Sequence, residues 1–173
     1  MVHMLALASA TDVFVKMAEP WAKLYSHSKA LSATVLFAHL APLIFSAGPA
    51  VMMDRATIRV ATSGGLNDRA RQLKEQHGIH RLIVVGLGVS AVSGLLLFAS
   101  DVETFLGSVY FWLKLAAVFL LLLNGYLITT TERKLLRWGD KDTVWARMKL
   151  HAYLSIFLWF ATALAGVVLA SFA

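Results

Sequence analysis

The chain has 173 residues, of which 58% are hydrophobic and 15% are charged, and its formal net charge is +6. Soluble domains carry about a quarter charged residues, so this composition indicates an integral membrane protein. The absence of cysteine excludes disulfides, thiolate metal sites, iron–sulfur clusters and covalently attached c-type haem. Because the basic residues flank apolar runs, the positive charge favours membrane topology over nucleic-acid binding.

The first 30 residues are predicted to form an amphipathic segment at the membrane interface. Thr11-Asp12 can cap a short helix, and Pro20 is expected to break or kink it. The apolar face of this helix would carry Phe14, Met17, Trp21 and Leu24. Such a segment is too polar to span a bilayer and is typical of a helix that lies in the interface.

Residues 31–173 are predicted to form an all-α bundle of four transmembrane helices. The expected spans are 31–53, 80–100, 105–130 and 150–172. Each is long enough to cross about 30 Å of hydrocarbon at 1.5 Å per residue, and a helix satisfies its own backbone polar groups. None of these spans contains Asp or Glu, so a carboxylate proton relay is not expected.

Two predicted polar loops, 54–79 and 131–149, are strongly basic. Together with Arg81 they hold 12 of the 16 Lys and Arg residues, whereas the short connection "SDVET" carries only Asp101 and Glu103. The positive-inside rule therefore places both basic loops in the cytoplasm and both termini outside. The expected location is a bacterial inner (plasma) membrane, which the chain crosses several times.

Small residues recur every four positions in two of the spans. They are Gly86, Ser90 and Gly94 in the second span, and Thr162, Gly166 and Ala170 in the fourth. Such stripes let neighbouring helices approach closely, so they indicate helix packing or oligomer contacts rather than chemistry.

Two polar side chains, His39 and Lys114, lie well inside the first and third spans. Both spans start from the outer face, and counting 1.5 Å per residue places the two groups within about 2 Å of the same depth. We therefore expect them to be neighbours at one internal site, where Lys114 is the candidate catalytic residue. Alternatively, Lys114 extends its ammonium group to the outer interface, and His39 is a neutral imidazole bonded to a backbone carbonyl.

A proline near His39 favours the functional interpretation. Pro42 has no N–H with which to bond the carbonyl of Ala38, and Pro49 repeats this break at Phe45. The opened backbone offers spare acceptors and local room, as membrane helices do where they line a cavity.

A second group of polar residues is predicted near the cytoplasmic face. His80 and His151 begin the second and fourth spans, and Asn124 reaches a similar level on the third. Two histidines that face a shared cavity can ligate a b-type haem iron axially. The candidate metal ligands at this face are therefore His80 and His151, and Asn124 is a further candidate cofactor-binding residue. The alternative is that His80 and His151 are ordinary interfacial residues.

The order of these features resembles a known family. A histidine in "LFAHLAPLIF", a basic loop, and the run "YFWLKLAAVFLLLL" are similar to the small haem-containing membrane protoporphyrinogen oxidases and the wider CopD-like four-helix group. The resemblance implies a b-type haem with His39 as axial ligand. It also implies that Lys114 holds a porphyrin carboxylate or takes part in proton transfer.

Two functions follow from the sequence. The first is an integral membrane b-type haem-binding protein, an oxidoreductase, that acts in electron transfer or in porphyrin or quinone redox chemistry. The second is a non-catalytic accessory subunit of a larger membrane complex, in which the polar groups join helices. The expected partners are the lipid membrane, a quinone or porphyrin, and a second copy of the chain or a larger complex.

Overall fold

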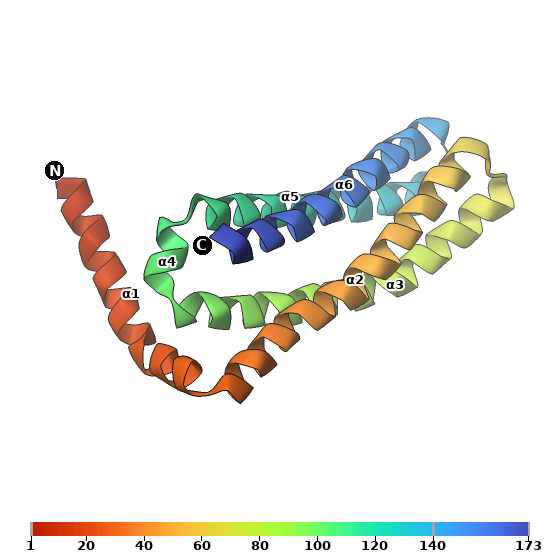
Figure 1. Cartoon of the computed structure of the whole chain (residues 1–173). Coiled ribbons are helices and arrows are strands. Elements are labelled where there is room, and N and C mark those ends of the chain that lie inside the picture. Colours follow the sequence, from red (N-terminus) through yellow and green to blue (C-terminus); the bar gives the residue numbers. More distant parts are fainter. Residues whose placement is uncertain (1, 140, 173) are drawn as a thin grey trace.

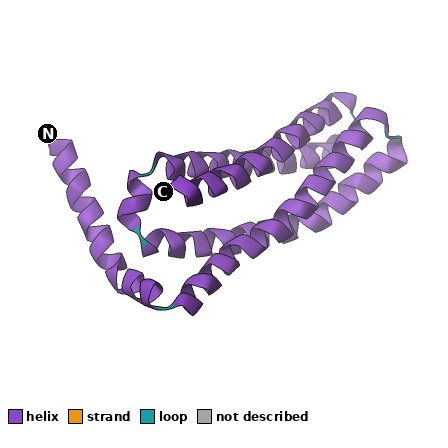
Figure 2. Cartoon of the chain, viewed as in Figure 1, coloured by secondary structure: helices purple, strands orange, loops and turns teal. Residues whose placement is uncertain are grey.

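The computed structural model describes residues 2–139 and 141–172, together with their side chains except those of 2–11, 77 and 138. All of the secondary structure in these residues is helical (Figures 1 and 2). The helices are α1 (Val2–His27), α2 (Lys29–Ser63), α3 (Leu66–Ser100), α4 (Val102–Gly107), α5 (Val109–Trp138) and α6 (Asp142–Phe172).

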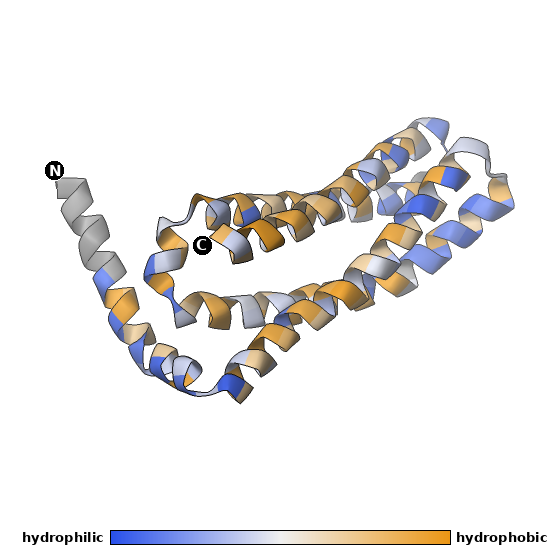
Figure 3. Ribbon diagram, in the orientation of Figure 1, coloured by the Kyte–Doolittle hydropathy of each residue, from blue (hydrophilic) through white to orange (hydrophobic). Residues whose placement is uncertain are grey.

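Four of these helices, α2, α3, α5 and α6, are long and apolar enough to cross a membrane. Hydrophobic residues cover their middle parts, and hydrophilic residues gather at the end where α2 meets α3 (Figure 3). The prediction of an all-α chain with four helices long and apolar enough to span a membrane is thus confirmed.

The prediction that residues 54–79 and 131–149 form loops is wrong, because most of these residues are helical. Both α2 and α3 have 35 residues, about 50 Å, so they extend well past about 30 Å of hydrocarbon. A hydropathy pattern shows where a helix leaves the lipid and not where the helix ends. The Arg, Lys, Gln and Glu residues beyond that point are good helix formers, so the helix continues. Most of these basic residues therefore lie on helical extensions beyond the apolar spans. We call this part of the molecule the basic end of the bundle.

Two short connections at the basic end are made by glycine. Gly64 and Gly65 alone join α2 to α3, and the Asp68 side chain accepts the Gly65 N–H at 3.3 Å to cap α3. Gly139 ends α5 with a φ of 81°, a left-handed conformation that side chains with a Cβ rarely adopt. These sharp stops let each pair of helices fold back directly.

The predicted third span, 105–130, is interrupted near its start. Asp101 caps the short helix α4 by accepting the Thr104 N–H at 3.2 Å, and the chain turns at Ser108 before α5 begins at Val109. An apolar sequence hides this turn because Phe105 and Leu106 are as hydrophobic as the residues of α5 that follow.

The N-terminal segment is a single helix, α1, that starts well before the predicted cap at Thr11-Asp12 and continues through Pro20. It bends before it reaches α2 (Figure 1). Trp21 donates its indole N–H to the carbonyl of Leu96 at 2.8 Å, which fixes α1 against the end of α3. Phe14 and Met17 are exposed, so the predicted apolar face does not pack as one surface on the bundle.

The long helices pack as two hairpins, α2 with α3 and α5 with α6, which meet along α2 and α6. A buried cluster of Ala50, Leu121, Leu158 and Trp159 fills this contact. In the part of the chain that the structure describes, the backbones of α3 and α5 come close at few points, although Phe98 of α3 stacks on Phe111 of α5 with ring centroids 5.4 Å apart. Side chains, rather than close backbone contact, therefore join these two helices.

Helices α2 and α3 approach most closely at Gly86. A Cβ atom there would collide with the buried Ser46 hydroxyl and would lie 3.0 Å from the carbonyl oxygen of Pro42. The stripe of small residues predicted in this span thus serves the packing of α2 on α3.

We expect Gly86→Leu to lower the melting temperature of the detergent-solubilised protein by several degrees, because overpacking a tight contact costs about 1–3 kcal/mol. The matched control is Gly88→Leu, since nothing lies within 4 Å of a Cβ atom at Gly88. Equal melting temperatures for the two variants, measured by thermal unfolding, would contradict this close approach.

Candidate functional site

The candidate site is centred on His39, which α2 directs against α3. The His39 Nδ1 atom lies 2.9 Å from the carbonyl oxygen of Ser90, and the Ser90 hydroxyl donates to the carbonyl of His39 at 3.1 Å. A Cβ atom at Gly94 would lie 3.1 Å from Cε1 of the ring. Helix α3 thus positions His39 through one bond to the imidazole and one bond to the His39 backbone carbonyl, with Gly94 close to the ring.

This arrangement fixes which ring nitrogen carries the proton. A carbonyl oxygen only accepts hydrogen bonds, so His39 Nδ1 must be the N–H donor to Ser90. In the neutral imidazole, Nε2 then presents a lone pair. The alternative interpretation of His39, a neutral imidazole bonded to a backbone carbonyl, therefore holds for the Nδ1 atom. The lone pair of Nε2 can still accept a hydrogen bond or bind a metal.

Lys114 reaches this second nitrogen from the opposite side of the bundle. Its Nζ atom lies 3.5 Å from His39 Nε2, and a Cβ atom at Gly166 would lie 3.9 Å from Cε and Nζ. The lysine stem thus passes the small stripe of α6 and ends beside the imidazole. The structure brings together the two groups that the sequence analysis predicted to be neighbours, and the ammonium does not extend to the outer interface.

The backbone acceptor freed by Pro42 is also accounted for. The carbonyl of Ala38 lies 3.2 Å from the hydroxyl of Ser93, which also lies 2.9 Å from the carbonyl of Val89. Both serine side chains are buried, so they provide bonds to α2 where lipid provides none. Ser90 was predicted only as a packing residue and Ser93 was not predicted at all, because hydroxyl pairing across helices leaves no pattern in one sequence.

The other predicted ligands lie nearer the basic end and do not join His39. His151 Nδ1 lies 3.0 Å from Asn124 Oδ1, and the Asn124 amide donates to the carbonyl of His151 at 3.0 Å. This reciprocal pair ties α5 to α6. His80 lines a separate cavity, whose lining residues do not include His151 or Asn124.

That cavity contains a group that sequence reasoning missed, Asp54. We expected Asp54 to begin a polar loop, but α2 continues through it and the side chain is buried. A signal was present: Ser46, Ala50 and Asp54 share four-residue spacing, which places them on one helix face. Asp54 thus lies on the buried face of α2, one residue past the predicted span 31–53.

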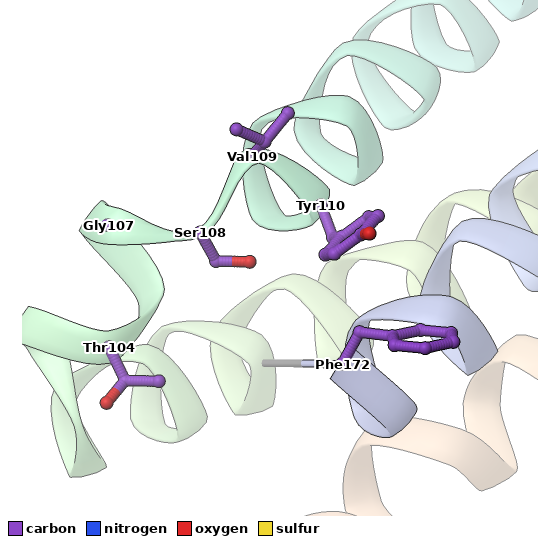
Figure 4. A pocket seen from close by; sticks show the side chains of 6 residues that line it. All are labelled: Thr104, Gly107, Ser108, Val109, Tyr110 and Phe172. Atoms are coloured by element: carbon purple, nitrogen blue, oxygen red, sulfur yellow. The ribbon is translucent and has the colours of Figure 1, made fainter.

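A larger, shallower hollow of about 560 Å³ lies at the opposite end, between the start of α5 and the end of α6. Figure 4 shows the rings of Tyr110 and Phe172 beside the Thr104 and Ser108 side chains. The two ring centroids are 5.7 Å apart. Tyr110 is one turn before Lys114 on α5, but the hollow holds no acid, base or histidine, so it offers little chemistry of its own.

The donor chemistry at His39 fits an axial haem ligand. A metal-binding histidine usually donates its other N–H to a carbonyl or carboxylate, which orients the ring, and Ser90 provides such a carbonyl. Among the residues that the structure describes, no three His, Asp or Glu side chains gather at one metal-binding point. His39, His80 and His151 are thus not ligands of a single ion.

We expect His39 to be the Nδ1–H tautomer when it is neutral, because its only backbone partner is an acceptor. Solution NMR of protein labelled with ¹⁵N-histidine, in detergent at mildly alkaline pH, distinguishes the two tautomers by their nitrogen shifts. The His39→Ala variant assigns the signal. An Nε2–H tautomer at His39 would contradict the geometry with Ser90.

Comparison of the chain with known proteins gives no relative. No protein-family model, no curated protein and no solved structure matches it. The resemblance to the haem-containing membrane oxidases therefore remains a prediction, and the candidate site depends on its own geometry.

Proposed function

We propose that the protein is an integral membrane protein that binds a b-type haem and takes part in electron transfer or in porphyrin or quinone redox chemistry. The observation that carries this proposal is the orientation of His39. Its Nδ1–H is bound to the carbonyl of Ser90, and its Nε2 lone pair faces the bundle interior beside Lys114. An imidazole held in this way is prepared to bind a metal.

Each residue of this site has a separate role in the proposal. His39 is the axial ligand, and Ser90 fixes the direction of its ring. Lys114 binds an anionic group, such as a porphyrin carboxylate, because a buried ammonium costs about 2.5–3.5 kcal/mol in a membrane and needs a partner. The haem would supply one-electron redox chemistry when bound.

His80 and His151 are the second candidate pair of axial ligands. As at His39, a contact at Nδ1 orients the ring of His151, because Asn124 Oδ1 lies 3.0 Å from this atom. His80 lines the cavity between α3 and α5. The two candidate haem positions lie at different depths and use different histidines. Single histidine variants therefore show which position holds the haem.

We expect protein purified from haem-replete cells to show a Soret band and, when reduced, alpha and beta bands. Loss of an outer partner of a metal ligand alone costs about 10–100-fold in affinity, so removing the ligand in His39→Ala should abolish these bands. Lys114→Met should keep the fold and lower haem retention. His27→Ala, at the exposed end of α1, is the matched control.

A colourless wild-type protein would overturn the haem proposal and favour the accessory-subunit alternative. Bands that survive His39→Ala but disappear in His80→Ala or His151→Ala would move the haem to the second pair. Wild-type haem content in Lys114→Met would remove Lys114 from the site.

We further propose that the chain lies in a bacterial inner (plasma) membrane with its basic end in the cytoplasm and both termini outside. Of the 16 basic residues, 12 lie at that end, and Asp101 and Glu103 lie at the other. In this orientation α1 lies outside, where its exposed Phe14 and Met17 contact the outer interface of the bilayer.

Cysteine labelling tests this orientation without background, because the chain has no cysteine. We expect Glu103→Cys to react with a membrane-impermeant maleimide added to intact cells, and Ser63→Cys to react only after the cells are opened. Both positions are exposed, so access to reagent depends on the side of the membrane. The reverse labelling pattern would invert the topology.

A further inference from the structure

A cavity of about 360 Å³ opens between α3 and α5, and its floor comes from α2 and α6. It lies toward the basic end, separate from His39. Fifteen residues along α2, about 22 Å, separate His39 from Asp54 in the cavity wall. Its apolar wall includes Ile79, Ile83, Leu87, Leu121, Ile128 and Trp159. Apolar walls with a few polar groups are typical of sites for small organic ligands.

The polar part of this wall has two buried acceptors without donors. Asp54 is 6% exposed and Gln76 is 8% exposed, and both line the cavity. No hydrogen bond reaches Asp54 Oδ2 or Gln76 Oε1. Ser155 is the hydrogen-bonding neighbour of the Asp54 carboxyl group, but it has one proton to give. Buried acceptors are normally paired, so these two oxygens favour a ligand that brings donors.

The surroundings decide between a cationic and a neutral donor. Arg133 also lines the cavity, and it lies at the end of the bundle that carries most of the positive charge. This charge disfavours an ammonium group and favours neutral hydroxyl donors. The neighbouring rings of Trp159 and Tyr126 provide faces on which a flat ring can pack.

The route of entry is lateral. In the described residues α3 and α5 share few close backbone contacts, and the cavity lies between them on the side that we infer faces the bilayer. A ligand dissolved in the lipid can enter there without crossing the basic end. A hydrophobic tail would stay in the lipid while the head lies beside Asp54.

We propose that this cavity binds a membrane quinol, with one hydroxyl donating to Asp54 and another to Gln76, and that it prefers the reduced form over the quinone. A quinone has only carbonyl acceptors, which would face the acceptor oxygens of both residues. This inference rests on the proposed redox function, because that function is the reason for choosing a quinone-class ligand for this cavity.

The test measures binding of duroquinol and duroquinone to the purified protein in detergent, by anaerobic equilibrium dialysis against empty micelles. We expect wild type to bind duroquinol about tenfold more tightly than duroquinone, as leaving a buried acceptor unpaired changes affinity by this order. Asp54→Leu and Gln76→Leu should each remove most of the preference. Asp54→Asn, nearly isosteric, adds an N–H donor and should also reduce it.

The matched control is Glu75→Gln, which changes an exposed side chain next to Gln76 on α3 and should leave the preference unchanged. Thermal unfolding shows whether each variant is folded. Equal wild-type affinities for the two forms, or an unchanged preference in folded Asp54→Asn, would overturn the inference.

The outcomes for haem and quinol are distinguishable because dialysis requires no bound haem. A colourless protein that prefers duroquinol supports this site and overturns only the haem proposal. A haem-loaded protein that binds both forms equally overturns this site and leaves the haem proposal standing.

Discussion

The contact between α2 and α3 determines the geometry of the candidate site. Pro42 removes one backbone hydrogen bond from α2 in a region where lipid offers no replacement. The hydroxyls of Ser90 and Ser93 reach the carbonyls of His39 and Ala38, and the glycines of α3 allow the two backbones to lie close enough for these bonds. The same contact sets the direction of the His39 ring, so both the packing of α2 on α3 and the geometry of the candidate ligand depend on it.

Hydropathy was sufficient to predict the number of membrane helices, and depth counting was sufficient to predict that His39 and Lys114 are neighbours. Both deductions use the fixed rise of a helix and the fixed thickness of a bilayer. The helix ends could not be predicted in this way. A helix that leaves lipid keeps its backbone bonds in water, so the polar residues after Met53 and Thr130 continue α2 and α5 without any change of structure.

The polar interior was harder to predict than the apolar one. Asp54 was assigned to a loop because it follows an apolar run directly, although its spacing from Ser46 and Ala50 places it on the buried face. The cavity around it depends on side chains from four helices. One sequence without its fold does not show which of these side chains meet, and it does not show that α3 and α5 stand apart.

The short turn at Gly64-Gly65 and the stop at Gly139 divide the chain into two helical hairpins of similar size, joined through α4. Each hairpin contains the close packing of its own two helices, and the main contact between the hairpins is that of α2 with α6. During synthesis the hairpin of α2 and α3 can insert into the bilayer as a unit before the hairpin of α5 and α6 is made. Fragments separated near Ser108 and produced from two genes should therefore be able to reassemble in the same membrane.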